Sequence, residues 1–186
     1  MQIITIAESE GMTELGEALA AQLRAGDLLV LSGPLGAGKT TLTRGIGAGL
    51  GVRGRVASPT FVLARTHPNL TGGPPLVHVD AYRLASAMEL DDLDIDFAGS
   101  VVVVEWGAGL LDGVAESWLE LDIVRPTGAG SESDSGDDAG SHGDGDGDGD
   151  GDDDDADTDA ADLDADEPRT VTIRGFGPRW ADSPYA

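Results

Sequence analysis

The chain has no cysteine, a single lysine and no long apolar run. The lack of cysteine excludes disulfides, cysteine-bound zinc and thiol nucleophiles, and it is consistent with a reducing compartment. The purely apolar runs, such as residues 101–104, fall far short of the ~20 residues needed to cross a bilayer. The first residues lack the basic and apolar regions of a secretory signal. We therefore expect a cytoplasmic protein that does not enter a membrane, and three scattered histidines without cysteine predict no zinc site.

Acidic residues outnumber basic ones, and they are concentrated in one tract. The 186 residues include 35 Asp and Glu against 11 Lys and Arg, and residues 128–168 hold 18 of the acids and none of the bases. Such a tract cannot bury enough apolar surface to offset chain ordering, so we predict a disordered insert rich in Asp and Gly. The remainder, residues 1–127 and 169–186, suffices for one mildly acidic globular domain. Neither part offers a basic face for gripping nucleic acid.

Hydrophobic patterning predicts an α/β fold with one mixed sheet flanked by helices. Short Val- and Leu-rich runs, typical of strands buried on both faces, occupy residues 28–31, 76–80 and 101–105. Further strands are expected at residues 2–7, 118–124 and 170–174, and residues 58–63 are expected to become extended. Helices are expected at residues 9–23 (capped by Ser9), 40–50 (stopped by Gly51) and 88–93. Because long helices are few, we expect the strands toward the C-terminus to be antiparallel.

Residues 33–40, GPLGAGKT, match the phosphate-binding pattern G-x-x-x-x-G-K-[ST] in full. A predicted buried strand precedes the pattern and a predicted helix follows it, which argues against a chance glycine-rich turn. The glycines let backbone N–H groups turn inward around phosphates, and the helix N-terminus adds free donors and a positive dipole end. Lys39 would reach the β- and γ-phosphates, and the Thr40 hydroxyl would face Mg²⁺. The predicted ligands are ATP and Mg²⁺.

Two acids, Asp80 and Glu105, follow predicted buried strands. Strand ends of this kind meet at the ligand-binding edge of an open α/β sheet, where an acid holds the Mg²⁺ shell or orients water. The sequence does not decide which of the two contacts the metal. Either acid alone is compatible with a solvated strand end, but the two together are not. His78 is either a catalytic base or a hydrogen-bonded structural residue, and we favour the second. Arg83 suits an arginine finger and a local salt bridge equally.

Four segments together resemble the TsaE family: LGAGKTTLTRG (35–45), SPTF (58–61), HVDAYRL (78–84) and VEW (104–106). The resemblance covers about residues 1–127 and 169–186. It implies a P-loop NTPase-like fold and the ATPase component of the machinery that makes N6-threonylcarbamoyladenosine in tRNA. It also implies slow hydrolysis alone, a TsaB–TsaD partner complex that ATP hydrolysis resets between turnovers, and contact with tRNA only through those partners.

The resemblance further implies residue roles. Thr40 and Glu105 would hold Mg²⁺, and Asp80 would act near the γ-phosphate or in the Mg²⁺ water shell. Thr60 would belong to a switch segment, and the catalytic set would be Lys39, Asp80 and Glu105. The implied nucleotide-binding set is Thr13, Gly33, Gly36, Ala37, Gly38, Lys39, Thr40, Thr41, Thr60 and Trp106. Two features depart from the family pattern: Pro34 replaces a frequent acid and removes an N–H donor, and the acidic insert is additional.

Three other functions are compatible with a phosphate loop. A small-molecule kinase usually has an arginine-bearing lid, but residues 107–118 contain no basic residue. A GTP-dependent switch usually carries Asn-Lys-x-Asp, which is absent because Lys39 is the only lysine. A nucleotide-sensing module without its own turnover stays open as an alternative, as does the kinase.

Overall fold

The structure, a computed structural model, describes residues 1–59, 61–84, 86, 89–90, 92–109, 114–125 and 167–186. The predicted switch residue Thr60 lies outside the described residues. So do residues 128–166 of the predicted insert, whose disorder therefore stays a prediction. The predicted helix over residues 88–93 lies partly outside them as well.

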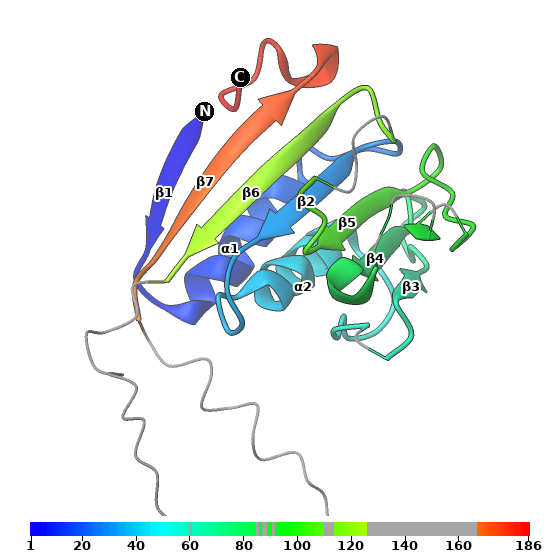
Figure 1. Ribbon diagram of the computed structural model, residues 1–186, viewed down its shortest axis with the longest axis horizontal. Coiled ribbons are helices and arrows are strands. Elements are labelled where there is room, and N and C mark those ends of the chain that lie inside the picture. Colours follow the sequence, from blue (N-terminus) through cyan, green and yellow to red (C-terminus); the bar gives the residue numbers. More distant parts are fainter. Residues whose placement is uncertain (60, 85, 87–88, 91, 110–113, 126–166) are drawn as a thin grey trace, which may run out of the picture.

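Seven strands form one mixed sheet in the order β1-β7-β6-β2-β5-β4-β3 (Figure 1). Neighbouring pairs within β6-β2-β5-β4 are parallel, whereas β1–β7, β7–β6 and β4–β3 are antiparallel. The predicted mixed sheet is confirmed. Of the strands toward the C-terminus, β7 is antiparallel to both of its neighbours, whereas β6 is antiparallel to β7 and parallel to β2. The strands are Gln2–Ile6 (β1), Leu28–Ser32 (β2), Ala64–His67 (β3), Leu76–Asp80 (β4), Val101–Glu105 (β5), Trp118–Val124 (β6) and Arg169–Phe176 (β7).

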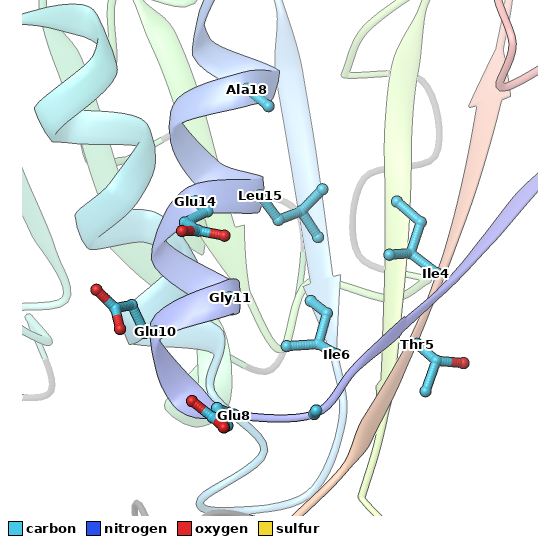
Figure 2. Close-up of a pocket in the computed structure, with 10 residues that line it drawn as sticks. Ile4, Thr5, Ile6, Glu8, Glu10, Gly11, Glu14, Leu15 and Ala18 are labelled. Carbon is cyan, nitrogen blue, oxygen red and sulfur yellow. The ribbon is translucent and has the colours of Figure 1, made fainter.

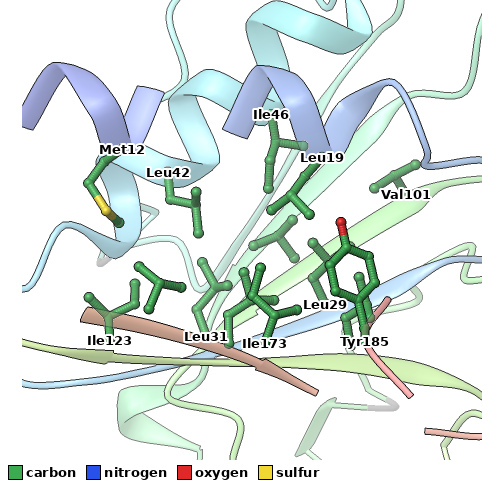
Figure 3. Close-up of a cluster of buried hydrophobic side chains, with 14 of the residues drawn as sticks. Met12, Leu19, Leu29, Leu31, Leu42, Ile46, Val101, Ile123, Ile173 and Tyr185 are labelled. Atoms are coloured by element: carbon green, nitrogen blue, oxygen red, sulfur yellow. The ribbon is translucent and has the colours of Figure 1, made fainter. Parts of the chain in front are cut away.

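Both longer helices, α1 (Ser9–Ala20) and α2 (Lys39–Leu50), pack on the same face of the sheet (Figure 1). Figure 3 shows Met12, Leu19, Leu42 and Ile46 pointing from the helices onto Leu31 and its neighbours in the sheet. The opposite face buries a second apolar cluster of the central strands. Side chains from the segments after β4 and β5 cover this cluster, namely Leu84, Leu90, Leu93, Ile95, Phe97, Val114 and Ala115.

The boundaries of α1 differ from the prediction. Ser9 is the first helical residue, and the N-cap is Glu8, which has extended backbone and makes no side-chain cap hydrogen bond. The helix ends at Ala20 rather than at residue 23, because the next turn tightens: the amides of Gln22 and Leu23 bond carbonyls three residues back. The end of α2 is as predicted, with Gly51 in the left-handed conformation as its C-cap.

The segment of residues 58–63 also differs from the prediction of an extended segment. The amides of Val62 and Leu63 both donate to the Pro59 carbonyl, at 2.9 and 2.8 Å, and Leu63 has a φ of 65°. The chain therefore turns here, and the strand begins at Ala64. Antiparallel pairing with β4, in which Ala64 lies opposite Val79, selects this later register.

Two short 3₁₀ helices are also present, η1 (Ala81–Arg83) directly after β4 and η3 (Pro178–Trp180) after β7. In the described part of the chain, no helix has the length and apolar character needed to span a membrane.

Candidate functional site

The glycine-rich loop connects β2 to α2, as predicted, and its glycines adopt conformations that other residues rarely take. Gly38 is the N-cap of α2 with a φ of 102°. Gly33 has a φ of 142°, and a Cβ there would lie 2.4 Å from the Ile123 carbonyl oxygen of β6. Side chains at either position would strain the backbone, so the loop requires glycine for its shape. Lys39 then opens α2, where free amides face the loop.

Lys39 is folded back over the loop. Its Nζ donates to the carbonyl oxygens of Gly33 at 2.8 Å and Pro34 at 2.9 Å, and it lies 3.7 Å from the centre of the Trp106 ring. Burial lowers the pKa of Lys39, and the nearby charges of Glu105 and Asp80 partly oppose that shift. Pro34 thus contributes through its carbonyl even though it lacks an N–H. Lys39 is the only basic residue in the sequence of the loop, and it therefore lies where an anion would bind.

The two strand-end acids meet beside this loop. Asp80 and Glu105 end the neighbouring parallel strands β4 and β5 and lie in register. The Thr40 hydroxyl donates to Glu105 Oε1 at 3.0 Å, whereas Asp80 Oδ1 accepts from the Tyr82 amide at 3.0 Å. Both carboxylates are buried. The structure therefore ties Glu105 to the loop and Asp80 to the start of η1.

His78 lies inside the sheet, next to Glu105. It is fully buried in β4, and its Nε2 is 2.7 Å from Glu105 Oε1. It is absent from the residues that line the cavity described next. This placement agrees with the hydrogen-bonded structural interpretation rather than with a base facing the ligand.

A cavity of about 600 Å³ opens over the loop, enough for a small organic ligand. The predicted site residues that line it are Gly36, Ala37, Gly38, Lys39, Thr40, Thr41, Asp80, Glu105 and Trp106. Two others do not line it: Gly33 packs against the Ile123 carbonyl of β6, and Thr13 lies in α1, where its carbonyl faces Gly45 of α2. Their predicted contacts with nucleotide stay predictions.

Further lining residues were missed from the sequence, among them Leu35, Arg44 and Tyr82. Arg44 follows Thr40 by four residues, so both occupy the same face of α2, and this spacing would have indicated it. Tyr82 is 71% exposed, and its ring meets the Trp106 ring edge-on, with the ring centres 5.3 Å apart. Its position follows from the turn that Asp80 caps, which the sequence pattern does not show.

Trp106 has a strained backbone. Its φ is 65°, a conformation that is rare for a bulky residue and often found at functional sites. The Trp106 amide donates to the Leu31 carbonyl at 2.9 Å and ties the end of β5 to β2. The resulting turn aims the ring at Lys39 and away from the apolar core.

A second hollow, of about 520 Å³, lies between β1 and α1 (Figure 2). Its floor is apolar, with Ile4, Ile6 and Leu15, and three glutamates but no basic residue line it. A phosphate group would be repelled there. The electrostatics therefore favour the cavity over the loop as the anion site.

The residues at the loop fit Mg²⁺. A hydroxyl and two carboxylates are the hard oxygen donors that this ion prefers. Within the described ranges, no three His, Asp or Glu side chains gather as an all-protein metal site would require. A magnesium ion held by Thr40 and Glu105 would therefore take its remaining ligands from water and from the phosphates of a nucleotide.

A phosphate loop between a buried parallel strand and a helix, with acids at the ends of neighbouring strands, defines the P-loop NTPase-like class of α/β folds. The crystal structure of YdiB from Bacillus subtilis has a similar fold, with a TM-score of 0.57 and 24% identity, over 94% of this chain and 84% of that one.

Sequence comparison then gives the family. The family described as "Threonylcarbamoyl adenosine biosynthesis protein TsaE" matches residues 6–132, and the chain belongs to the TsaE family. The tRNA threonylcarbamoyladenosine biosynthesis protein TsaE of Streptomyces coelicolor is 51% identical, over 91% of this chain and 94% of the relative. The protein of the same name from Mycobacterium leprae is 50% identical, over 62% of this chain and 78% of the relative. The resemblance inferred from four short segments is confirmed.

Proposed function

We propose that this chain binds ATP with Mg²⁺ in the cavity over residues 33–40 and hydrolyses it slowly, as a component of tRNA threonylcarbamoyladenosine biosynthesis. We further propose that hydrolysis resets a TsaB–TsaD complex between turnovers, and that tRNA is reached through those partners. The observation that carries the nucleotide site is the contact between Thr40 and Glu105, 3.0 Å long, which joins the loop to the end of β5.

The proposed role of each residue follows from its position in the site. Loop amides and Lys39 would bind and orient the phosphates, because both present N–H donors inside one glycine-rich turn. Thr40 and Glu105 would hold Mg²⁺, which neutralises charge on the β- and γ-phosphates when bound. Asp80 is placed next to Glu105, and its orientation is fixed by the Tyr82 amide. It would orient the attacking water or the water shell of the ion.

The exposed side chains at the rim of the cavity support the proposal of a protein partner. Leu35 and Tyr82, which line the cavity, are 81% and 71% exposed, and Phe61 in the adjoining turn is 93% exposed. Large exposed side chains such as Leu35 and Tyr82 at the opening favour a protein–protein contact. A partner that covers them would also exclude water from the phosphates, which is a physical reason for slow hydrolysis by the chain alone.

The test is ATP hydrolysis by the purified chain, with and without purified TsaB–TsaD. We expect a slow basal rate and a clear increase with the partner complex. Unchanged hydrolysis with partner, despite tight ATP binding, would favour the nucleotide-sensing alternative. Transfer of phosphate to a small molecule would favour the kinase.

Lys39→Ala provides the first specific prediction. Losing a charge-assisted contact to phosphate costs ~1.5–3 kcal/mol, which corresponds to about 10- to 150-fold weaker ATP binding. Titration with a fluorescent ATP analogue measures the change. Arg174→Ala is the matched control, because Arg174 is a partly exposed cation on β7 that pairs with Glu120, at 3.6 Å. Equal affinities for Lys39→Ala and the unmodified chain would refute the phosphate-binding role.

A further inference from the structure

His78 is a polar residue in an apolar part of the sheet. It lies in the middle of β4, opposite Val103 of β5, and its side chain is completely buried. Its sequence neighbours Val77 and Val79 are apolar and buried as well. A valine or leucine would suit this position by burial alone, so the imidazole needs a reason of its own.

The contacts of His78 are unevenly distributed between its two ring nitrogens. Nε2 lies 2.7 Å from Glu105 Oε1, whereas the buried Nδ1 has no hydrogen-bond partner among the described residues. An ionised carboxylate only accepts, so Nε2 is the donor in this contact, and the buried Nδ1 is left unpaired. A buried unpaired polar nitrogen is destabilising. The interaction with Glu105 is therefore what the histidine supplies.

Glu105 Oε1 receives two hydrogen bonds, one from His78 Nε2 and one from the Thr40 hydroxyl, at 3.0 Å. Two donors on one oxygen fix the rotation of the carboxylate. The Thr40 proton is also committed to Glu105, so the lone pairs of that hydroxyl are available to a cation. Glu105 Oε2 takes no part in either bond. The Thr40 hydroxyl oxygen and Glu105 Oε2 are thus the two oxygens left to bind a cation, and His78 bonds to neither of them.

We propose that His78 is a positioning residue that orients Glu105, and through it Thr40, for the Mg²⁺ of the bound nucleotide. The inference rests on the proposed function, because it concerns the metal of the same site. Partners that orient metal ligands change metal affinity by about 10- to 100-fold when they are removed. Binding of nucleotide without metal should be unaffected, because His78 does not line the cavity.

Two amide substitutions separate positioning from packing. In His78→Gln the side-chain NH₂ reaches close to the place of Nε2 and can still donate to Glu105. In His78→Asn the NH₂ corresponds to the nearer ring position and falls short. The probe is Mn²⁺, titrated by electron paramagnetic resonance into the complex with ADP. We expect at least tenfold weaker Mn²⁺ binding in His78→Asn and within about threefold of the unmodified chain in His78→Gln.

His67→Asn is the matched control. His67 is also a buried histidine whose Nε2 has no partner among the described residues, but it lies opposite Leu76 at the far end of β4 from Glu105. Mn²⁺ affinity in this variant should be unchanged. ADP affinity measured in EDTA should be the same in all four proteins.

Several results would overturn the inference. Mn²⁺ affinity within twofold of normal in His78→Asn would make His78 a packing residue only. Equal losses in His78→Asn and His67→Asn would indicate a general effect on the sheet. If His78→Asn does not fold, nitrogen NMR of the unmodified chain decides, because an imidazole protonated on Nδ1 and not on Nε2 contradicts the proposed bond. Failure of the unmodified chain to bind ADP would refute the proposed nucleotide site instead.

Discussion

At the scale of single residues, the site depends on charged side chains that are buried rather than exposed to water. Lys39 is buried, bonded to two loop carbonyls and placed against an aromatic ring. Glu105 is buried and accepts from two donors. Both groups are oriented before any ligand arrives, which reduces the ordering that binding must supply. Their electrostatics lead to two predictions.

The first concerns pH. Burial lowers the pKa of Lys39, so this lysine loses its proton at a lower pH than an exposed lysine does. ADP affinity should therefore fall as pH rises, and the fall should begin below the ordinary lysine value of about 10.4. Isothermal titration between pH 7 and 10 measures it. In Lys39→Arg the guanidinium stays charged, so the dependence should vanish. A constant affinity up to pH 10 in the unmodified chain would contradict the assignment.

The second compares Glu105→Gln with Asp80→Asn. Both should keep the fold and reduce ATP hydrolysis. Glu105→Gln should raise the Mg²⁺ concentration at half-maximal activity more strongly, because Glu105 contacts Thr40 while Asp80 bonds the Tyr82 amide. A magnesium titration of both variants decides the matter. If only Asp80→Asn shifts the midpoint, the two roles are reversed.

At the scale of elements, α1 and α2 approach each other through glycines. A Cβ on Gly45 would lie 2.2 Å from the Thr13 carbonyl oxygen, and one on Gly16 would lie 2.4 Å from the Leu42 carbonyl oxygen. Their backbones are thus in direct contact. Met12 of α1 also lies within 3.4 Å of a Cβ built on Gly38.

Gly45→Ala tests this packing. The methyl group must push the helices apart, and we expect a loss of about 1–3 kcal/mol in the free energy of unfolding. Thermal and urea denaturation measure it. The control is Ala48→Ser, an exposed position on the same helix, where the change should stay within about 0.5 kcal/mol. A melting temperature for Gly45→Ala equal to that of the control would show that the helices can separate without cost.

At the scale of the whole molecule, the acidic tract joins β6 to β7, which are antiparallel neighbours. Arg125, shortly before the tract, and Glu167, near its end, form an ion pair of 2.7 Å, and Arg125 Nη1 also lies 3.4 Å from the Gly36 carbonyl oxygen. The tract therefore leaves and re-enters the sheet at one point beside the loop. A short connection could therefore join β6 to β7 in place of the tract.

Deleting residues 128–166, with the ion pair kept, should leave the fold and ATP affinity nearly unchanged. Shortening a loop by about three halvings of its length stabilises by no more than about 2 kcal/mol. Differential scanning calorimetry measures the stability, and ATP titration at low and high salt measures the affinity. The idea of a passive tract fails if the melting temperature drops by several degrees, or if ATP affinity changes strongly at low salt only.

Much of this architecture is encoded locally. The phosphate loop, the buried strands around it and the two strand-end acids were predictable, because glycine spacing, apolar runs and chain order determine them within short windows. Other features depend on distant parts of the chain. β3 begins at Ala64 because β4 sets its register, and α1 begins at Ser9 without a side-chain cap. The pairing of His78 with Glu105 joins residues 27 positions apart in sequence. The sequence alone determined the phosphate loop and the two strand-end acids. The tertiary structure decided which further side chains join them and which of these groups touch, because the register between parallel strands is settled by packing across the sheet.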